Sequence, residues 1–269
     1  MKKLDSFKIS FFVVFIYCVF AIVLLLTEYA ELGGAMFCAL PLAIGLSSGM
    51  LPDLKESLYG MFLSLVIFSV ILVFTKIEGI ICLLMAAPIL IFCSWLGWLL
   101  GQAFRKNKEK SLKLSFAPLT IFVLVNLFEV FNGVTFDHKA VSTTFEINGT
   151  PEQVYNSIIA VDTVNVETSL LQKVGLPIPR KCELSAPEVG GTRYCEFEEG
   201  YIIERITALE PNRYLRMDVE ECHLSKERHW LKFEEDIYQI QKINEDKTQI
   251  TRTTTYKSNL KPRFYWDLM

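Results

Sequence analysis

Residues 192–209 read TRYCEFEEGYIIERITAL, and this stretch decides the fold of the second half of the chain. Two runs with alternating apolar and polar residues flank Glu199-Gly200, which is typical of a β-hairpin with a two-residue turn. Such a turn fixes which residues lie opposite each other. The predicted pairs are Glu198 with Tyr201, Phe197 with Ile202, Cys195 with Glu204, and Arg193 with Ile206.

One face of this hairpin is apolar and should point inward, yet it also carries Arg193 and Glu204 as diagonal neighbours. A buried arginine and a buried glutamate need each other, because either alone would carry a large desolvation penalty. The pair is either an anchor for a ligand's polar head group inside an apolar cavity or a structural ion pair. The predicted lining of that cavity is Arg193, Cys195, Phe197, Ile202, Glu204, Ile206, Leu215, Met217 and Tyr256.

The rest of this half has the same strand-rich pattern. Thr150 and Pro151 start a helix after the first strand, and a second helix is expected over 166–174. The strands should form one curled antiparallel sheet with the short helices at one end, which is an α+β domain. Strands are predicted at about 141–147, 181–186, 192–198, 201–209, 213–221, 229–243 and 248–256.

The first half of the chain has a different composition. The whole sequence is 51% hydrophobic and 21% charged, with a mean hydropathy of +0.32, so part of it is expected in lipid. Residues 1–133 carry ten Lys and Arg against eight Asp and Glu in long apolar blocks, whereas 134–269 carry seventeen against twenty-two. We therefore predict a membrane domain over 1–133 and a water-facing domain over 134–269. The net charge of −3 without a basic cluster excludes nucleic acid as a partner.

Five apolar stretches are long enough to cross a hydrocarbon core of roughly 30 Å as helices. They give the predicted fold class of an α-helical bundle of about five spans, followed by the α+β domain. The fifth stretch contains two polar residues and decides on which side of the membrane the second domain lies. The predicted spans are 9–27, 32–51, 58–75, 79–104 and 114–131.

Loop charges predict the orientation. If the helices alternate, nine Lys and Arg lie on the side of the N-terminus and only Lys76 lies on the other side. Because cytoplasmic loops carry the excess of basic residues, the N-terminus is expected in the cytoplasm. Five spans then place the second domain on the outer side of the membrane.

Glu78, Asn126 and Glu129 are the notable polar residues of the predicted membrane domain. Membrane carboxylates are costly to keep, so they can indicate ion or proton movement. Glu78 and Glu129 lie near predicted helix ends, where a hydrated structural carboxylate is the alternative. Gly45 and Gly49 follow the spacing that lets helices pack closely.

The sequence lacks a recognisable catalytic or metal-binding pattern. His138, His223 and His229 lack the spacing of a zinc site, so no metal, no cofactor and no catalytic residue is predicted. Cys182 and Cys195 could form a disulfide, but the predicted pairing does not place them opposite each other, so free thiols are expected. The acidic run 234–236 is expected to be a solvated strand edge rather than a calcium site.

Several segments resemble one known superfamily. TTFEINGTPEQVYNSI at 143–158, VGGTRYCEFEEG at 189–200 and TTTYKSNLKPRFYWDLM at 253–269 are similar to START-related domains of the polyketide cyclase/dehydrase type, also called SRPBCC. The resemblance covers roughly 141–269 and implies a helix-grip fold, in which a curved antiparallel sheet wraps around a long C-terminal helix and encloses an apolar cavity. EGIICLLMAAP at 78–88 looks like the membrane part that precedes such domains in bacterial proteins, which implies a bacterial plasma membrane.

The chain departs from that pattern after its last strand. The long helix of the family should start near Pro262, but the sequence ends at Met269. The cavity would then lack its main wall, and the inward apolar face would need another cover. Lipid, a second copy of the chain, another partner or the membrane bundle are the candidates.

Three functions follow from these patterns. The leading hypothesis is a non-enzymatic, membrane-tethered protein that binds an apolar or lipid-like small molecule in the helix-grip cavity. The enzyme alternative is a cyclase or dehydrase acting on a polyketide-like substrate with Glu204, Arg193 or Tyr256 as acid/base groups, although histidine and paired carboxylates are scarce. The third is a transport or assembly component in which the helical bundle is the functional part.

Overall fold

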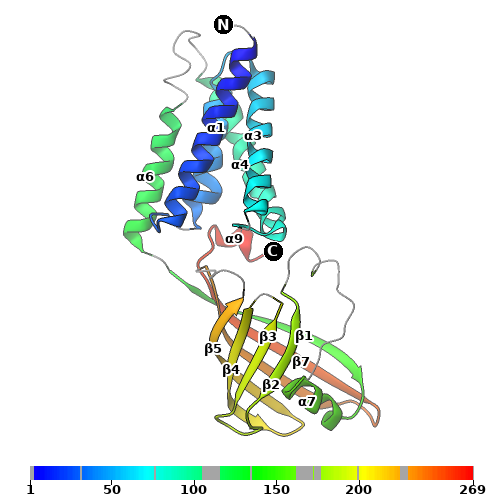
Figure 1. Ribbon diagram of the computed structural model, residues 1–269. Coiled ribbons are helices and arrows are strands. Elements are labelled where there is room, and N and C mark those ends of the chain that lie inside the picture. Colours follow the sequence, from blue (N-terminus) through cyan, green and yellow to red (C-terminus); the bar gives the residue numbers. More distant parts are fainter. Residues whose placement is uncertain are drawn as a thin grey trace. The chain divides into compact units, whose positions relative to one another are not determined.

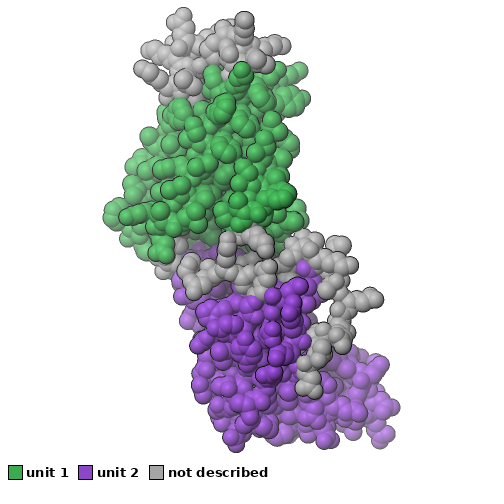
Figure 2. Space-filling view, viewed as in Figure 1, with its two compact units in different colours: residues 1–135, 260–269 green, residues 136–259 purple. Residues whose placement is uncertain are grey.

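The computed structural model divides the chain into two compact units (Figures 1 and 2). One unit comprises residues 1–135 and 260–269, and the other comprises 136–259. The chain thus leaves the helical unit, forms the sheet unit, and returns to the helical unit with its last residues. The structure describes residues 3–30, 32–75, 77–104, 116–133, 135–161, 172, 177–198, 200–224 and 230–268.

Among its described residues, the helical unit contains three helices that are long and apolar enough to cross a membrane, not the five predicted. The predicted second and fifth spans form shorter apolar helices, Ala35–Gly49 and Ala117–Asn132. Apolar length alone overestimated the second span, because Gly33 and Gly34 precede its regular helix and Pro52 follows it, whereas the first two residues of the predicted fifth span lie outside the described residues. The elements are α1 (Lys3–Leu26), η1 (Ala35–Ala39, a π-helix), α2 (Leu40–Gly49), α3 (Leu54–Phe74), α4 (Ile80–Ala103) and α6 (Ala117–Asn132).

Helices α2 and α4 pack backbone against backbone. A Cβ added to Gly45 would lie 2.0 Å from the Ser94 carbonyl oxygen, and one added to Gly97 would lie 2.2 Å from the Leu42 carbonyl oxygen. Neither position can hold a larger residue unless the helices separate. The close helix packing predicted from Gly45 and Gly49 is therefore confirmed.

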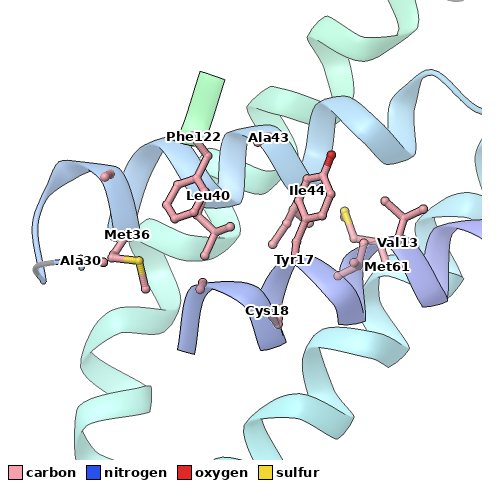
Figure 3. Packing of buried hydrophobic residues seen from close by; sticks show 13 residues of the cluster. Val13, Tyr17, Cys18, Ala30, Met36, Leu40, Ala43, Ile44, Met61 and Phe122 are labelled. Carbon is pink, nitrogen blue, oxygen red and sulfur yellow. The ribbon is translucent and has the colours of Figure 1, made fainter. Parts of the chain in front are cut away.

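A buried apolar cluster joins α1, α2, α3 and α6 within this unit (Figure 3). Tyr17 and Phe122 are fully buried in it, and the Tyr17 hydroxyl accepts a hydrogen bond from Ser47 at 3.1 Å. Ser10 similarly bonds to Ser48 at 3.0 Å. Because hydroxyls without partners are costly in an apolar interior, these pairs help to fix the packing of the helices.

The described residues of the sheet unit form a seven-stranded antiparallel sheet with the strand order β1-β7-β6-β5-β4-β3-β2. The first and last strands are therefore neighbours, with Asp137 opposite Ser258. Among the described residues of this unit, helix α7 (Pro151–Ile159) follows β1, and Thr150 caps it as predicted. The strands are β1 (Asp137–Asn148), β2 (Pro179–Leu184), β3 (Thr192–Phe197), β4 (Gly200–Glu210), β5 (Tyr214–Leu224), β6 (Leu231–Lys242) and β7 (Lys247–Ser258).

The β3–β4 hairpin differs from the prediction by two residues. Phe197 lies opposite Gly200 instead of Ile202, and Gly200 is the first residue of β4. Gly200 has φ +110°, and a Cβ there would lie 1.7 Å from the His223 carbonyl oxygen, so this strand position requires glycine. A shift of two residues keeps every side chain on its predicted face, because strands alternate with a period of two.

The apolar face of α7 covers one end of the sheet. This is the end where β4 and β6 finish and where β5 and β7 begin. Ile206, Leu215 and Met217 are fully buried there. Burial of an apolar side chain contributes roughly 1.5–3 kcal/mol, so this cluster is the main stabilising core of the unit. Its members are Val154, Tyr155, Ile159, Ile206, Leu215, Met217, Tyr238, Ile240 and Ile250.

The helix expected to start near Pro262 is only the four-residue α9 (Arg263–Trp266). Pro262 is its N-cap, in line with the predicted start. However, α9 belongs to the helical unit and not to the sheet unit that the family resemblance assigned it to. The predicted second helix at 166–174 lies almost entirely outside the described residues.

Candidate functional site

A buried ion pair lies on the inner face of the sheet, on adjacent strands. Arg193 of β3 is directly opposite Glu204 of β4, rather than diagonal to it as predicted. The side chains are only 7% and 4% exposed, and Arg193 Nε donates to Glu204 Oε2 at 2.7 Å. Arg193 Nη1 also donates to the Ile158 carbonyl oxygen of α7 at 2.9 Å. The pair therefore links the sheet to the end of its covering helix.

A second ion pair lies two strands further on, and the sequence reasoning missed it. Asp236 of β6 accepts a bond of 2.6 Å from Arg252 Nη2 of β7, and the Thr254 hydroxyl donates to its other oxygen. The Asp236 side chain is 8% exposed, whereas that of Arg252 is 47% exposed. The expectation of a solvated acidic run was thus wrong for Asp236. Its alternation with Tyr238 and Ile240 was the sequence signal that could have shown this.

The two pairs form one electrostatic network. Burial raises the pKa of the Glu204 carboxyl, although Arg193 opposes this effect, and the negative charge of Asp236 raises the pKa further. Burial also raises the pKa of Tyr238, which lies beneath the Arg252 guanidinium with 5.5 Å between the Arg252 Cζ and the ring centre. Two guanidinium groups and two carboxylates share this face, so the ionised network has no net charge.

Arg193 keeps its positive charge inside the sheet unit. Burial would lower the pKa of its guanidinium, but Glu204 and Tyr238 raise it, and their effect is the larger. Glu204 is therefore held beside a fixed cation. The same pairing that stabilises the fold places polar groups beside the apolar side chains of this face.

Away from the two ion pairs, the side chains of the inner face are less buried. Phe197 and Ile202 alternate inward with the buried pair, and Tyr256 lies on the same face of β7, yet all three are only half-buried. The cluster buried under α7 closes one end of the face. The ion pairs lie between this cluster and the half-buried residues. A molecule with an apolar body and a polar end could contact such an apolar surface and the hydrogen-bonding groups beside it.

The remaining predicted lining residues divide into two groups. Ile206, Leu215 and Met217 are fully buried under α7. Cys195 is buried and forms a disulfide with Cys182, directly opposite on β2, so the expectation of free thiols was wrong. The error came from leaving the β2–β3 register undetermined.

The polar residues of the helical unit have structural partners. Glu129 accepts hydrogen bonds from the backbone N–H groups of Gly34 at 2.8 Å and Ala35 at 3.1 Å, which caps η1 from α6. Asn126, one turn earlier, donates to the Tyr29 carbonyl oxygen at 2.7 Å. Both residues thus hold the segment that follows α1. Glu78 lies just before α4 and also has an interaction within the protein.

Metal ligands do not converge in the part of the chain that the structure describes. No group of three or more His, Cys, Asp or Glu side chains there could hold a metal ion. His138 contacts Glu234 at 2.8 Å on the surface, and His223 lies 3.7 Å from Glu221. His229 lies outside the described residues.

Comparison with known proteins gives structural neighbours only. No family model and no curated protein matches the chain. Aha1 from Colwellia psychrerythraea is similar at 19% identity, over 45% of this chain and 76% of its own length, with a TM-score of 0.29. A truncated norcoclaurine synthase from Thalictrum flavum is similar at 12% identity, over 51% of this chain and 84% of its own, with a TM-score of 0.34. Similarity at this level assigns no function.

Proposed function

We propose that this protein binds an apolar or lipid-like small molecule on the inner face of the sheet unit and is tethered to a membrane by its helical unit. The half-buried inner face beside the Arg193–Glu204 pair carries the proposal. Burying apolar surface there would stabilise a complex by roughly 25 cal/mol per Å². The ion pairs would orient the polar end of the ligand.

The neutral network indicates the kind of polar end. A ligand with a net charge would add an uncompensated charge to a largely buried site, which is costly. A hydroxyl, amide or similar uncharged group could instead accept a hydrogen bond from Arg252, whose side chain is 47% exposed. We therefore expect an uncharged polar head on an apolar body.

The proposed location is a plasma membrane with the sheet unit on the outer side. The nine-to-one distribution of basic residues applies only to five alternating spans; with the three long helices as the spans, four basic residues lie on the N-terminal side and six on the other, so loop charge does not support the orientation. Three spanning helices would place the sheet unit across the membrane from the N-terminus, which is the outer side if the N-terminus is cytoplasmic. The Cys182–Cys195 disulfide supports the outer side, because disulfides persist in oxidising compartments.

Mass spectrometry of the detergent-extracted full chain tests the proposal. The variant is Arg193→Met with Glu204→Leu, which removes the buried pair without leaving one charge alone. The matched control is Arg205→Met with Glu220→Leu, an ion pair on the exposed face of β4 and β5. Wild type and control should carry the same small molecule, and the inner-face variant should lose it. An identical complement in all three proteins would refute the proposed site.

A further inference from the structure

The segment after β7 is attached to the helical unit by several side-chain and backbone contacts. The Tyr265 hydroxyl donates to the Met85 carbonyl oxygen of α4, and the Trp266 ring packs edge-on against Phe37 of η1 with 4.8 Å between ring centres. The Lys261 N–H donates to the Leu32 carbonyl oxygen at 3.3 Å. Residues 260–268, which we name the return segment, thus have a defined place on the helical unit.

The contacts locate the return segment near one end of the spans. Met85 follows Ile80, the first residue of α4, by five residues, which corresponds to about 7.5 Å along a helix. Helix α4 has 24 residues and is about 36 Å long, somewhat more than a hydrocarbon core of roughly 30 Å. The Tyr265 hydroxyl therefore lies close to the level where headgroups meet acyl chains in a membrane-spanning α4.

The composition of the return segment fits that level. Tyr265 and Trp266 have the amphipathic rings that concentrate at membrane interfaces, and Lys261 and Arg263 can contact lipid phosphates. Phe264 is 75% exposed. Leu268, four residues later, is 84% exposed. Two large apolar side chains left uncovered beside interfacial aromatic and basic residues indicate an apolar environment outside the protein.

We propose that the return segment is an interfacial membrane anchor, in which Phe264 and Leu268 insert into lipid and the basic residues contact headgroups. This inference rests on the proposed membrane insertion of the helical unit. It adds a second attachment, so that the sheet unit is held to the membrane domain from both β1 and β7.

The test attaches the fluorophore NBD to single introduced cysteines in the full chain, reconstituted in phosphatidylcholine–phosphatidylglycerol nanodiscs. The test positions are Phe264→Cys and Leu268→Cys. Phe92→Cys, on an exposed position midway along α4, reports whether the helical unit spans the bilayer. Glu245→Cys, in the β6–β7 turn, is the aqueous control, roughly 40 Å of strand away from the return segment. The unaltered chain gives the labelling background from native cysteines.

Lipids that carry a spin label at a shallow or a deep position quench NBD according to its depth. Labels at 264 and 268 should be quenched most by the shallow lipid, at a depth of about 5–10 Å below the headgroup boundary. The label at 92 should be quenched most by the deep lipid, and the label at 245 by neither. A quenched label at 92 with unquenched labels at 264 and 268 would overturn the anchor alone, whether water or protein covers the segment. An unquenched label at 92 would overturn membrane insertion and the anchor together.

Discussion

Replacing Arg193 with Met should destabilise the sheet unit, because Glu204 would remain buried without its partner. The side chains are 7% and 4% exposed, so solvent can compensate little. Breaking a buried pair in this way costs about 3–5 kcal/mol, whereas replacing both members with apolar residues is often neutral or stabilising. Arg193→Met should therefore be much less stable than the double variant Arg193→Met with Glu204→Leu.

Hydrogen exchange followed by mass spectrometry on the full chain in nanodiscs measures this difference locally. Exchange in peptides from β3 and β4 should become roughly a hundred- to several-thousand-fold faster in Arg193→Met, where opening of the sheet controls it. Peptides from α4 should be unchanged. Equal exchange in the single variant, the double variant and wild type would refute the conclusion that the pair is buried and coupled.

The effect should also depend on pH. Burial raises the pKa of Glu204 in the folded protein, so its contribution favours folding below the ordinary carboxyl value of 4.5 and is lost as the pH rises through the raised pKa. Without Arg193 the opposing effect disappears and the pKa should rise further. The deficit of Arg193→Met relative to the double variant should therefore shrink as the pH is lowered from neutral. A deficit that grows on acidification would contradict this assignment.

Three further changes test the packing and the bonds described above. Gly97→Ala should destabilise the bundle by about 1–3 kcal/mol, measured as an earlier midpoint of unfolding in detergent, whereas Gly79→Ala, where a Cβ meets nothing within 4 Å, should change it little. Glu129→Leu should cost about 1–3 kcal/mol in the same assay because two backbone donors lose their acceptor. The unfolding midpoint of Glu129→Gln should lie between those of wild type and Glu129→Leu. Wild-type midpoints for both variants would disprove the capping role. Removing the disulfide with Cys182→Ala and Cys195→Ala should lower the stability of the sheet unit by about 3 kcal/mol in hydrogen exchange, and a reductant should reproduce the loss only in wild type.

The sheet could be predicted from sequence because its strands alternate clearly and its turns are marked. The prediction that Arg193 and Glu204 point inward was correct although the predicted turn position was wrong, since a shift of two residues leaves each side chain on the same face of its strand. The Cys182–Cys195 pairing could not be obtained in the same way. It depends on the register of β2 against β3, which no short turn fixes.

The number of long helices was overestimated for a physical reason. Apolar composition predicts what lipid tolerates, whereas helix ends are set by residues such as Gly33, Gly34 and Pro52. The partners of Glu129 could not be predicted either, because they are backbone groups far away in the sequence. The place of α9 depends on contacts of Tyr265 and Trp266 with helices at the other end of the chain.

The central claim is that a small molecule occupies the inner face of the sheet unit. Photo-crosslinking in intact membranes tests it most directly, with benzoylphenylalanine in place of Phe197 on the inner face or Tyr194 on the outer face of the same strand. Mass spectrometry should find one small-molecule adduct of defined mass at position 197 and none at 194. The absence of an adduct at 197, or the same adducts at both positions, would contradict the claim.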